Sequence, residues 1–168
     1  MIDEKSLKIL NILQEKARIP NVEVARQLQM APSAVLERIR KLEKQGIIDG
    51  YEVRLNPQRF RRSQVAFITV ATDRGKAAQH VGARLAAIPE IQEVHFVSGD
   101  DGYLVKARVA DSAELGRLIQ AKIAPIKAIR STRTAIVMDT IKETARIPIG
   151  ALDQTEQRGE TDAQDCEW

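Results

Sequence analysis

The segment MAPSAVLERIRKLEKQG, residues 30–46, carries small side chains followed by long cations at helical spacing. Residues three or four apart are neighbours on a helix surface, so these side chains form two adjacent rows. Small residues at the start of a helix let its backbone approach base edges in a DNA major groove, and cations behind them reach phosphates or guanine. The DNA-contacting residues that this pattern predicts are Pro32, Ser33, Ala34, Glu37, Arg38, Arg40, Lys41 and Lys44.

The charges of this segment also have a plainer interpretation. Glu37 is spaced to pair with Arg40 and Lys41 along the helix, which would leave an ordinary solvated face. Residues 1–62 hold 13 Lys and Arg against 8 Asp and Glu, whereas residues 63–168 hold 13 against 15. The basic first part favours a nucleic-acid partner, but an imbalance of this size is equally compatible with a solvated surface.

Three short helices are predicted to position this surface. Leucine and isoleucine at helical spacing predict a helix over residues 3–17, which Pro20 ends because it forces the preceding residue out of helical geometry. Asn21 is a suitable N-cap for a second helix over residues 21–30. Pro32 suits the first turn of the third helix, and Gly46 supplies a left-handed stop. The buried stripe of that helix would be Val35, Leu36, Ile39 and Leu42.

The segment after the third helix, IIDGYEVRLNP, alternates apolar and polar residues around Asp-Gly, which predicts a small β-hairpin. Three helices and a hairpin make a winged helix-turn-helix, here expected over residues 1–55. Residues 56–63 form a basic linker, in which Arg59, Arg61 and Arg62 would either touch phosphates or lie on a solvated hinge.

The remainder is expected to fold as a ferredoxin-like βαββαβ domain over residues 64–149. Apolar and β-branched runs predict strands at 64–73, 91–98, 103–109 and 131–142, with helices at 76–88 and 111–123. The fold class is therefore α+β. Residues 150–168 are polar and acidic and are expected to be disordered, with Trp168 either mobile or docked.

The first of these strands is apolar on both sides, since Val65, Phe67 and Thr69 alternate with Ala66 and Ile68. Two helices cover only one face of a four-stranded sheet, so the other face needs a partner. A second copy of the chain is the expected partner, and a homodimer would also place two reading helices on two half-sites of double-stranded DNA.

Several of these motifs together resemble the Lrp/AsnC family of transcription regulators. The resemblance lies in Arg18-Ile19, Val24-Ala25-Arg26, Pro32-Ser33, and Leu42-Glu43 leading to Gly46-Ile47-Ile48. It extends to about residue 149 and departs at Ala31, where the family has Ser as the helix cap. It implies a DNA-binding regulator with an effector domain called RAM, which is similar to ACT domains. It further implies assembly beyond the dimer, commonly an octamer, and an amino acid effector.

The loop SGDDGYL, residues 98–104, corresponds to the family's effector loop, which reads Gly-Asp-Tyr-Asp. Gly99 and Asp100 match this pattern, whereas Asp101 and Gly102 depart from it. A carboxylate here would receive an ammonium group and backbone N–H groups would receive a carboxylate, but Asp-Gly is also a plain hairpin turn. Thr132 and Thr134 match paired threonines of the family, and ordinary strand positions are the alternative.

No enzyme motif stands out in the chain. His80 and His95 are its only histidines, and no His, Cys and Asp cluster has metal-ligand spacing, so neither a cofactor nor a metal is expected. A haem-pathway decarboxylase of similar architecture and a ligand-binding adaptor without DNA binding remain alternatives. No apolar run approaches the length of a membrane span, and the single Cys166 fits a cytoplasmic protein.

Overall fold

The computed structural model describes residues 2–73, 80–99 and 102–149. By internal contacts the chain divides into two compact units. The first contains residues 2–53 together with 144–149, and the second contains residues 54–143. The chain therefore passes from one unit to the other twice, once on either side of the second unit.

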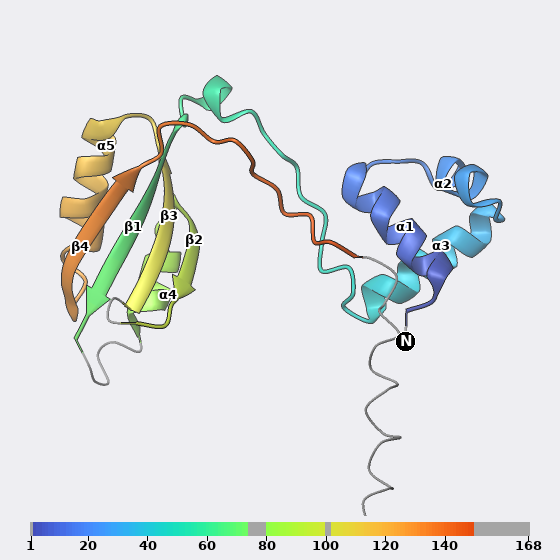
Figure 1. The fold of residues 1–168 in the computed structure, drawn as a ribbon, viewed down its shortest axis with the longest axis horizontal. Helices are drawn as coiled ribbons and strands as arrows, with labels where there is room; N and C mark the ends of the chain where they lie inside the picture. Colours follow the sequence, from blue (N-terminus) through green and yellow to red (C-terminus); the bar gives the residue numbers. More distant parts are fainter. Residues whose placement is uncertain (1, 74–79, 100–101, 150–168) are drawn as a thin grey trace, which may run out of the picture. The chain divides into compact units, whose positions relative to one another are not determined.

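The first unit consists of three helices, α1 (Glu4–Glu15), α2 (Asn21–Leu28) and α3 (Pro32–Lys44) (Figure 1). Its core joins buried apolar side chains from all three helices. Ile9, Val24 and Val35 have no exposed surface, and Leu13, Ala25 and Ile39 complete the cluster. This burial fixes which face of each helix points to solvent. On α3 Leu36 is only half-buried, whereas Val35, Ile39 and Leu42 are buried as predicted.

The helix ends follow the sequence in part. Asp3 caps α1, since its carboxylate accepts a hydrogen bond of 2.8 Å from the Ser6 backbone N–H. The prediction that Asn21 caps α2 is wrong, because Pro20 occupies the cap position and Asn21 is already helical. Pro20 has an extended backbone, and no side chain caps the start of α2 with a hydrogen bond. Gly46 has a φ of +67° and ends α3 as predicted.

The predicted hairpin is wrong in its local detail, because no strand forms within residues 47–56. The segment is extended, and the Tyr51 hydroxyl ties it to α3 by donating a 3.0 Å hydrogen bond to Glu43. Val53 is 84% exposed and Leu55 61%, so these two apolar side chains are largely uncovered by the described part of the structure. A two-stranded hairpin without a surface to pack on is marginal at best.

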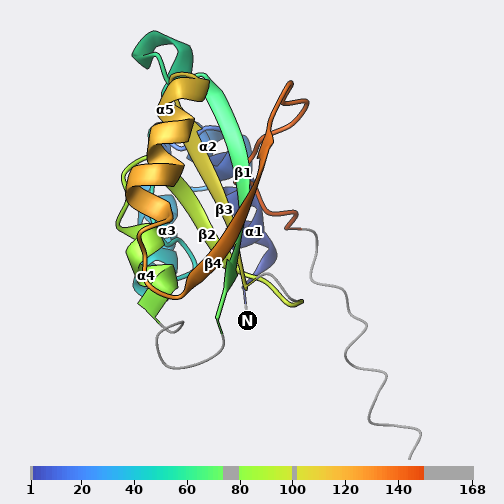
Figure 2. The same cartoon turned by 90° about the vertical axis from the view of Figure 1, so that its left-hand side faces the viewer.

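The second unit has the expected βαββαβ order after a short 3₁₀ turn η1 (Pro57–Phe60). It contains β1 (Gln64–Thr72), α4 (Val81–Ala86), β2 (Ile91–Phe96), β3 (Gly102–Val109), α5 (Ser112–Arg117), the π-helical turn η3 (Leu118–Ile123) and β4 (Ile129–Ile136). The antiparallel sheet has the order β2-β3-β1-β4, with α4 and α5 on one face (Figures 1 and 2). This is the ferredoxin-like arrangement.

Some element bounds differ from the sequence prediction. The single helix predicted over residues 111–123 is α5 followed by η3, and the strand predicted to reach residue 142 ends at Ile136. The helix predicted from residue 76 begins outside the described residues, and α4 covers its last part. The predicted tail, residues 150–168, also lies outside the described residues.

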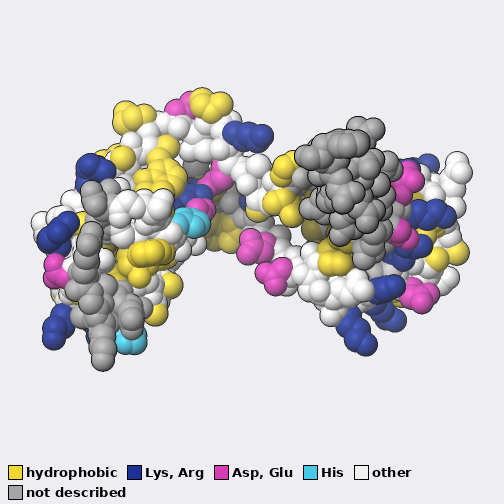
Figure 3. Space-filling view, turned by 60° about the horizontal axis from the view of Figure 1, so that its bottom comes forward, with side chains coloured by type: hydrophobic (Ala, Val, Ile, Leu, Met, Phe, Trp, Pro, Cys, Tyr) yellow, Lys and Arg dark blue, Asp and Glu magenta, His cyan; other side chains and the backbone are white. Residues whose placement is uncertain are grey.

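The two faces of the sheet differ in character. On the helix-covered face Ala66, Ile68 and Val70 are fully buried against the α4 and α5 side chains. On the other face Phe67 of β1 is 38% exposed and stands opposite Lys106 of β3. That face is thus mixed in polarity rather than uniformly apolar. Seen from below, the molecular surface likewise shows exposed hydrophobic side chains beside Lys and Arg (Figure 3).

Candidate nucleic-acid interface

The outer side of α3 presents the residues that the sequence predicts for DNA contact. Ser33, Glu37, Arg40, Lys41 and Lys44 are exposed, because the opposite side of the helix is buried against α1 and α2. Among the described ion pairs none involves Glu37, Arg40, Lys41 or Lys44. The intrahelical pairing that would make this a self-neutralised face is therefore not formed, and the three cations remain available to a partner.

Arg38 differs from its neighbours because it is held within the first unit. Its Nη1 donates to Asp3 Oδ2 at 2.5 Å and to Ser6 Oγ at 3.1 Å. Hydrogen bonds from Ser6, and then from Arg38, hold the pKa of the Asp3 carboxyl well below its usual range. Ser6 is the one buried polar residue of the part described. The guanidinium thus joins α3 to the beginning of α1, and a phosphate contact by Arg38 remains a prediction.

The beginning of α3 is open for an anion or a base edge. Its cap residue, Ala31, offers no side-chain hydrogen bond, and Pro32 occupies the first turn. The first backbone N–H with a partner is that of Val35, which donates to the Ala31 carbonyl at 3.1 Å. The N–H groups of Ser33 and Ala34 have no partner among the described residues, and they lie at the positive end of the helix dipole.

The turn between α2 and α3 is tight and fixed by the backbone. Gln29 adopts a left-handed conformation with a φ of 53°, and the Met30 N–H donates to the Ala25 carbonyl at 2.9 Å. On α2, Arg26 is engaged with Glu23, whose pKa the Arg26 and Gln27 hydrogen bonds lower to about 2. A short turn of this kind between two packed helices is the defining feature of the helix-turn-helix.

Two of the candidate effector residues, Gly99 and Gly102, lie at one end of the sheet. Gly99 and Gly102 have φ values of 119° and 96°, and the Val97 N–H donates to the Gly102 carbonyl at 2.9 Å, as in a hairpin turn. Asp100 and Asp101 lie outside the described residues. A side chain at Gly102 would approach Thr72 Oγ1 to 3.0 Å. The position therefore favours glycine for both backbone and packing reasons.

The two threonines of β4 lie near the same end of the sheet. Thr132 pairs with Val70 of β1, and Thr134 pairs with Ile68. Because cross-strand partners share a face, both half-buried threonines point to the helix-covered side. Gly102 of β3 pairs with Ala71, the neighbour of Val70, so one strand separates the loop from Thr132, roughly 10 Å in all.

The histidines do not form a catalytic or metal-binding cluster within the described residues. His95 lies on β2, is exposed and has its Nε2 3.2 Å from Glu93 Oε2. No helix in the described part of the chain is both long and apolar enough to cross a membrane.

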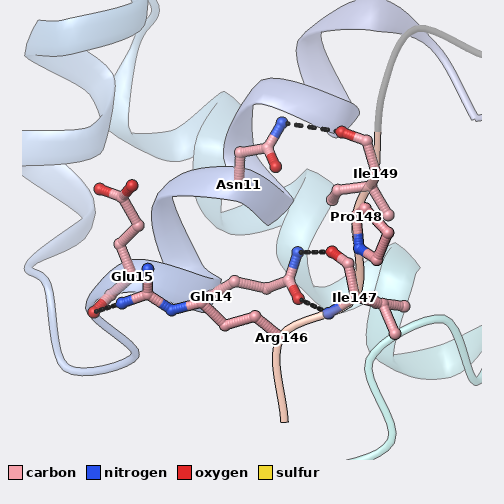
Figure 4. A pocket seen from close by; sticks show the side chains of 7 residues that line it. All are labelled: Asn11, Gln14, Glu15, Arg146, Ile147, Pro148 and Ile149. Carbon is pink, nitrogen blue, oxygen red and sulfur yellow. Dashed lines mark hydrogen bonds between the residues drawn. The ribbon is translucent and has the colours of Figure 1, made fainter. Parts of the chain in front are cut away.

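Sequence reasoning missed a contact between α1 and residues 146–149, which we call the return arm. Gln14 pairs reciprocally with the Ile147 backbone, donating at 3.1 Å and accepting at 2.8 Å (Figure 4). Asn11 donates to the Ile149 carbonyl at 3.4 Å, and Arg146 to the Glu15 carbonyl at 3.5 Å. These groups line a hollow of about 460 Å³. No local sequence signal connects positions this far apart.

Two family models match the chain, one on each side of the linker. The model described as a winged helix-turn-helix DNA-binding domain matches residues 2–49. The model described as the Lrp/AsnC ligand binding domain matches residues 65–147. Each match falls on an architecture described above, three helices in the first case and the βαββαβ sheet in the second.

Curated relatives and solved structures agree with these matches. The leucine-responsive regulatory protein of Haemophilus influenzae is 38% identical over 85% of this chain and 87% of its own length. The protein of the same name from Escherichia coli is 36% identical over 88% of this chain and 92% of its own length. A Neisseria meningitidis transcriptional regulator solved as an L-Met complex superposes with a TM-score of 0.84 at 28% identity, covering 88% of this chain and 97% of that one. Escherichia coli AsnC superposes with a TM-score of 0.81 at 26% sequence identity, covering 88% of this chain and 99% of that one. The chain belongs to the Lrp/AsnC family of DNA-binding transcription regulators.

Proposed function

We propose that α3 enters the DNA major groove with Ser33, Ala34 and Glu37 near base edges and with Arg40, Lys41 and Lys44 on phosphates. The observation that carries this assignment is the exposure of all three cations on the side of α3 that faces away from the core, where none of them has an ion pair with a described residue. The partnerless N–H groups at the start of α3 add donors for a phosphate, as helix N-termini commonly do. Arg38 steadies the helix through Asp3 and can offer DNA its remaining donors.

The regulator acts as a homodimer, or a higher assembly of dimers, in which the helix-free faces of two sheets meet. Phe67 on that face is 38% exposed in the single chain, which favours coverage by an apolar surface. When the helical units of both copies bind two half-sites of one duplex, affinity rises because the second contact is intramolecular. Operator sequences should therefore show two-fold symmetry.

An amino acid effector would bind at the loop end of the sheet, with Gly99, Asp100, Asp101, Gly102, Thr132 and Thr134 as the candidate residues. Support comes from the ligand-binding family model and from the L-Met named in the solved relative. The departure from the family motif at Asp101 and Gly102 predicts an effector preference that differs from that of the relatives.

The protein acts by binding and not as an enzyme, and it works in the cytoplasm, where duplex DNA is accessible. Membership of a regulator family supports the first statement and its DNA target the second. A decarboxylase of similar architecture would instead bind a tetrapyrrole, and the complex would be coloured. A protein-binding adaptor would give no DNA complex even at low salt.

Selection of bound sequences from a random duplex pool, with and without each of the twenty amino acids, tests the proposal. We expect enrichment of two related half-sites about one helical turn of DNA, or a multiple of it, apart. The selected complex should weaken steeply as salt rises, because phosphate contacts release counterions. No enrichment at low salt would refute DNA recognition, and enrichment unaffected by every amino acid would refute the effector assignment.

A further inference from the structure

Three arginines lie close together in a turn that the DNA-reading helix does not include. The turn consists of η1 and the two residues after it, 57–62, and is here called the basic turn. Arg59 and Arg61 are exposed, and neither side chain has an ion pair or a hydrogen bond with a described residue. From residue 53 to residue 72 the chain contains no Asp or Glu. The basic turn therefore carries positive charge that no neighbour along the chain neutralises.

The backbone of the basic turn is closed by its own hydrogen bonds. Asn56 Oδ1 accepts a hydrogen bond of 3.0 Å from the Gln58 N–H. The Arg62 N–H donates to the Pro57 carbonyl at 2.9 Å, and the Arg61 N–H donates to the Gln58 carbonyl at 3.2 Å. Arg61 has a φ of 51°, a left-handed conformation that is uncommon outside glycine. Because the backbone is already ordered, a partner that binds these side chains need not order the chain first.

The third arginine fixes the basic turn to the second unit. Arg62 Nη1 donates to Glu114 Oε1, and the Ala110 N–H donates to the other oxygen of this carboxylate at 2.6 Å. Gln64 and Ser112 are joined by a 3.4 Å hydrogen bond between their side chains. The basic turn thus lies where β1 begins, beside the beginning of α5 (Figure 2). Glu114, the carboxylate that holds the turn, already has a donor on each oxygen.

Exposed guanidinium groups on an ordered turn fit the phosphates of a nucleic acid. A guanidinium can bind phosphate oxygens through two parallel hydrogen bonds, and it is always charged. A contact of this kind adds affinity at any sequence, because the phosphates are the same at every base pair.

The connection to α3 sets how far from the reading helix such a contact can lie. Residues 47–56 contain no helix or strand. Even when fully extended, the chain from the end of α3 to the basic turn spans no more than about 36 Å. This length corresponds to about ten base pairs of a DNA duplex. A duplex held by α3 therefore has phosphates within reach of the basic turn.

We propose that the basic turn is a second DNA-contact surface, in which Arg59 and Arg61 bind phosphates of the duplex that α3 reads. The inference rests on the proposed DNA binding by α3 and extends the contact to the second unit. In this arrangement α3 supplies the contacts to base edges, and the basic turn adds affinity without sequence preference. Arg62 keeps the turn in place through Glu114.

Equilibrium binding of the full chain to two DNA duplexes tests the proposal. One duplex carries a site obtained by selection, flanked on each side by more than one helical turn of unrelated sequence. The other is a scrambled duplex of the same length. The variant is Arg59→Gln/Arg61→Gln. The matched control is Arg84→Gln/Arg130→Gln, which removes two exposed cations elsewhere on the second unit.

In the Arg59→Gln/Arg61→Gln variant we expect affinity at physiological salt to fall by about tenfold or more, and by the same factor for both duplexes. The slope of log K against log salt should become less steep by about 1.8 for each copy that contacts the duplex. The control should keep the affinity and the slope of the wild-type chain. Circular dichroism and light scattering check that each variant keeps its fold and its assembly state.

Unchanged affinity in the Arg59→Gln/Arg61→Gln variant, or an equal loss in the control, would overturn the inference and leave DNA reading by α3 intact. A loss of affinity together with a smaller assembly in light scattering would assign the two arginines to contacts between copies, and would overturn it as well. If the wild-type chain bound neither duplex, the proposed function itself would fail. The two failures are therefore distinguishable.

Discussion

Replacing Arg40 by alanine removes one exposed cation from the outer side of α3 and no ion pair or hydrogen bond of the described structure. Surface substitutions of this kind change the free energy of unfolding by no more than about 0.5 kcal/mol. The loss of a DNA contact should weaken binding by about 1–3 kcal/mol for each helical unit that contacts the duplex. The variant is therefore expected to remain fully folded and to bind DNA poorly.

The salt dependence gives a sharper measure than the affinity. Each phosphate contact contributes about −0.9 to the slope of log K against log salt, and a dimer loses two contacts when each copy loses one. The slope should therefore become less steep by about 1.8. Fluorescence anisotropy with a duplex chosen by selection, measured between low and physiological salt, resolves a change of this size.

Arg84→Ala is the matched control for this experiment. Arg84 is an exposed cation on α4 of the second unit, so the substitution changes the net charge equally. A general electrostatic effect would lower affinity alike in both variants, whereas a contact by Arg40 affects only Arg40→Ala. If the two variants gave the same salt slope, the assignment of α3 as the DNA-reading surface would be refuted.

Three further predictions concern the framework that carries the sites. Ile39→Ala should lower the free energy of unfolding of the first unit by about 2–5 kcal/mol in urea denaturation, since Ile39 is 7% exposed in the helical core. Gly46→Ala should cost about 1–2 kcal/mol through its left-handed φ of +67°, although no atom lies within 4 Å of the added methyl group. The hydrogen bond from Lys106, helped by nearby positive charges and opposed by burial, holds the pKa of Glu143 below its ordinary value of 4.5, so its contribution to stability is present above that pH and disappears as the pH falls. Glu143→Gln should therefore flatten the acid side of the stability curve measured by thermal denaturation, and an unchanged curve would contradict that ion pair.

The parts of the fold that the sequence predicts are those with a local cause. The stripe of Val35, Ile39 and Leu42 repeats at helical spacing, and the structure buries all three. The alternation in β1 identifies both faces of the strand before any partner is known. Gly46 takes a left-handed φ just after α3, a position where glycine is favoured because it has no Cβ. In each case the residues within one or two turns decide the outcome.

The parts that the sequence does not predict depend on partners far along the chain. The Asp-Gly motif near Tyr51 is a sound hairpin signal, but strands pair only when a surface covers one face of them. Arg38 looks like one more cation of the reading surface until Asp3, 35 residues away, is found beside it. The pairing of Gln14 with the Ile147 backbone spans 133 residues and follows no periodicity.

The return arm has a consequence for the linkage of the two units. The linker of residues 56–63 alone would leave the helical unit attached at one point, with most of its rotational freedom. The chain instead comes back at residues 144–149 and pairs with α1 through Gln14. A second covalent connection removes conformational entropy in the same way that closing a loop does. Its contribution depends on contacts at the surface of α1, each of which, as a neutral hydrogen bond, is worth only about 0.5–1.5 kcal/mol. A link of that strength can open and close at equilibrium, so Gln14→Ala should increase amide exchange at Ile147 while leaving the helical core intact.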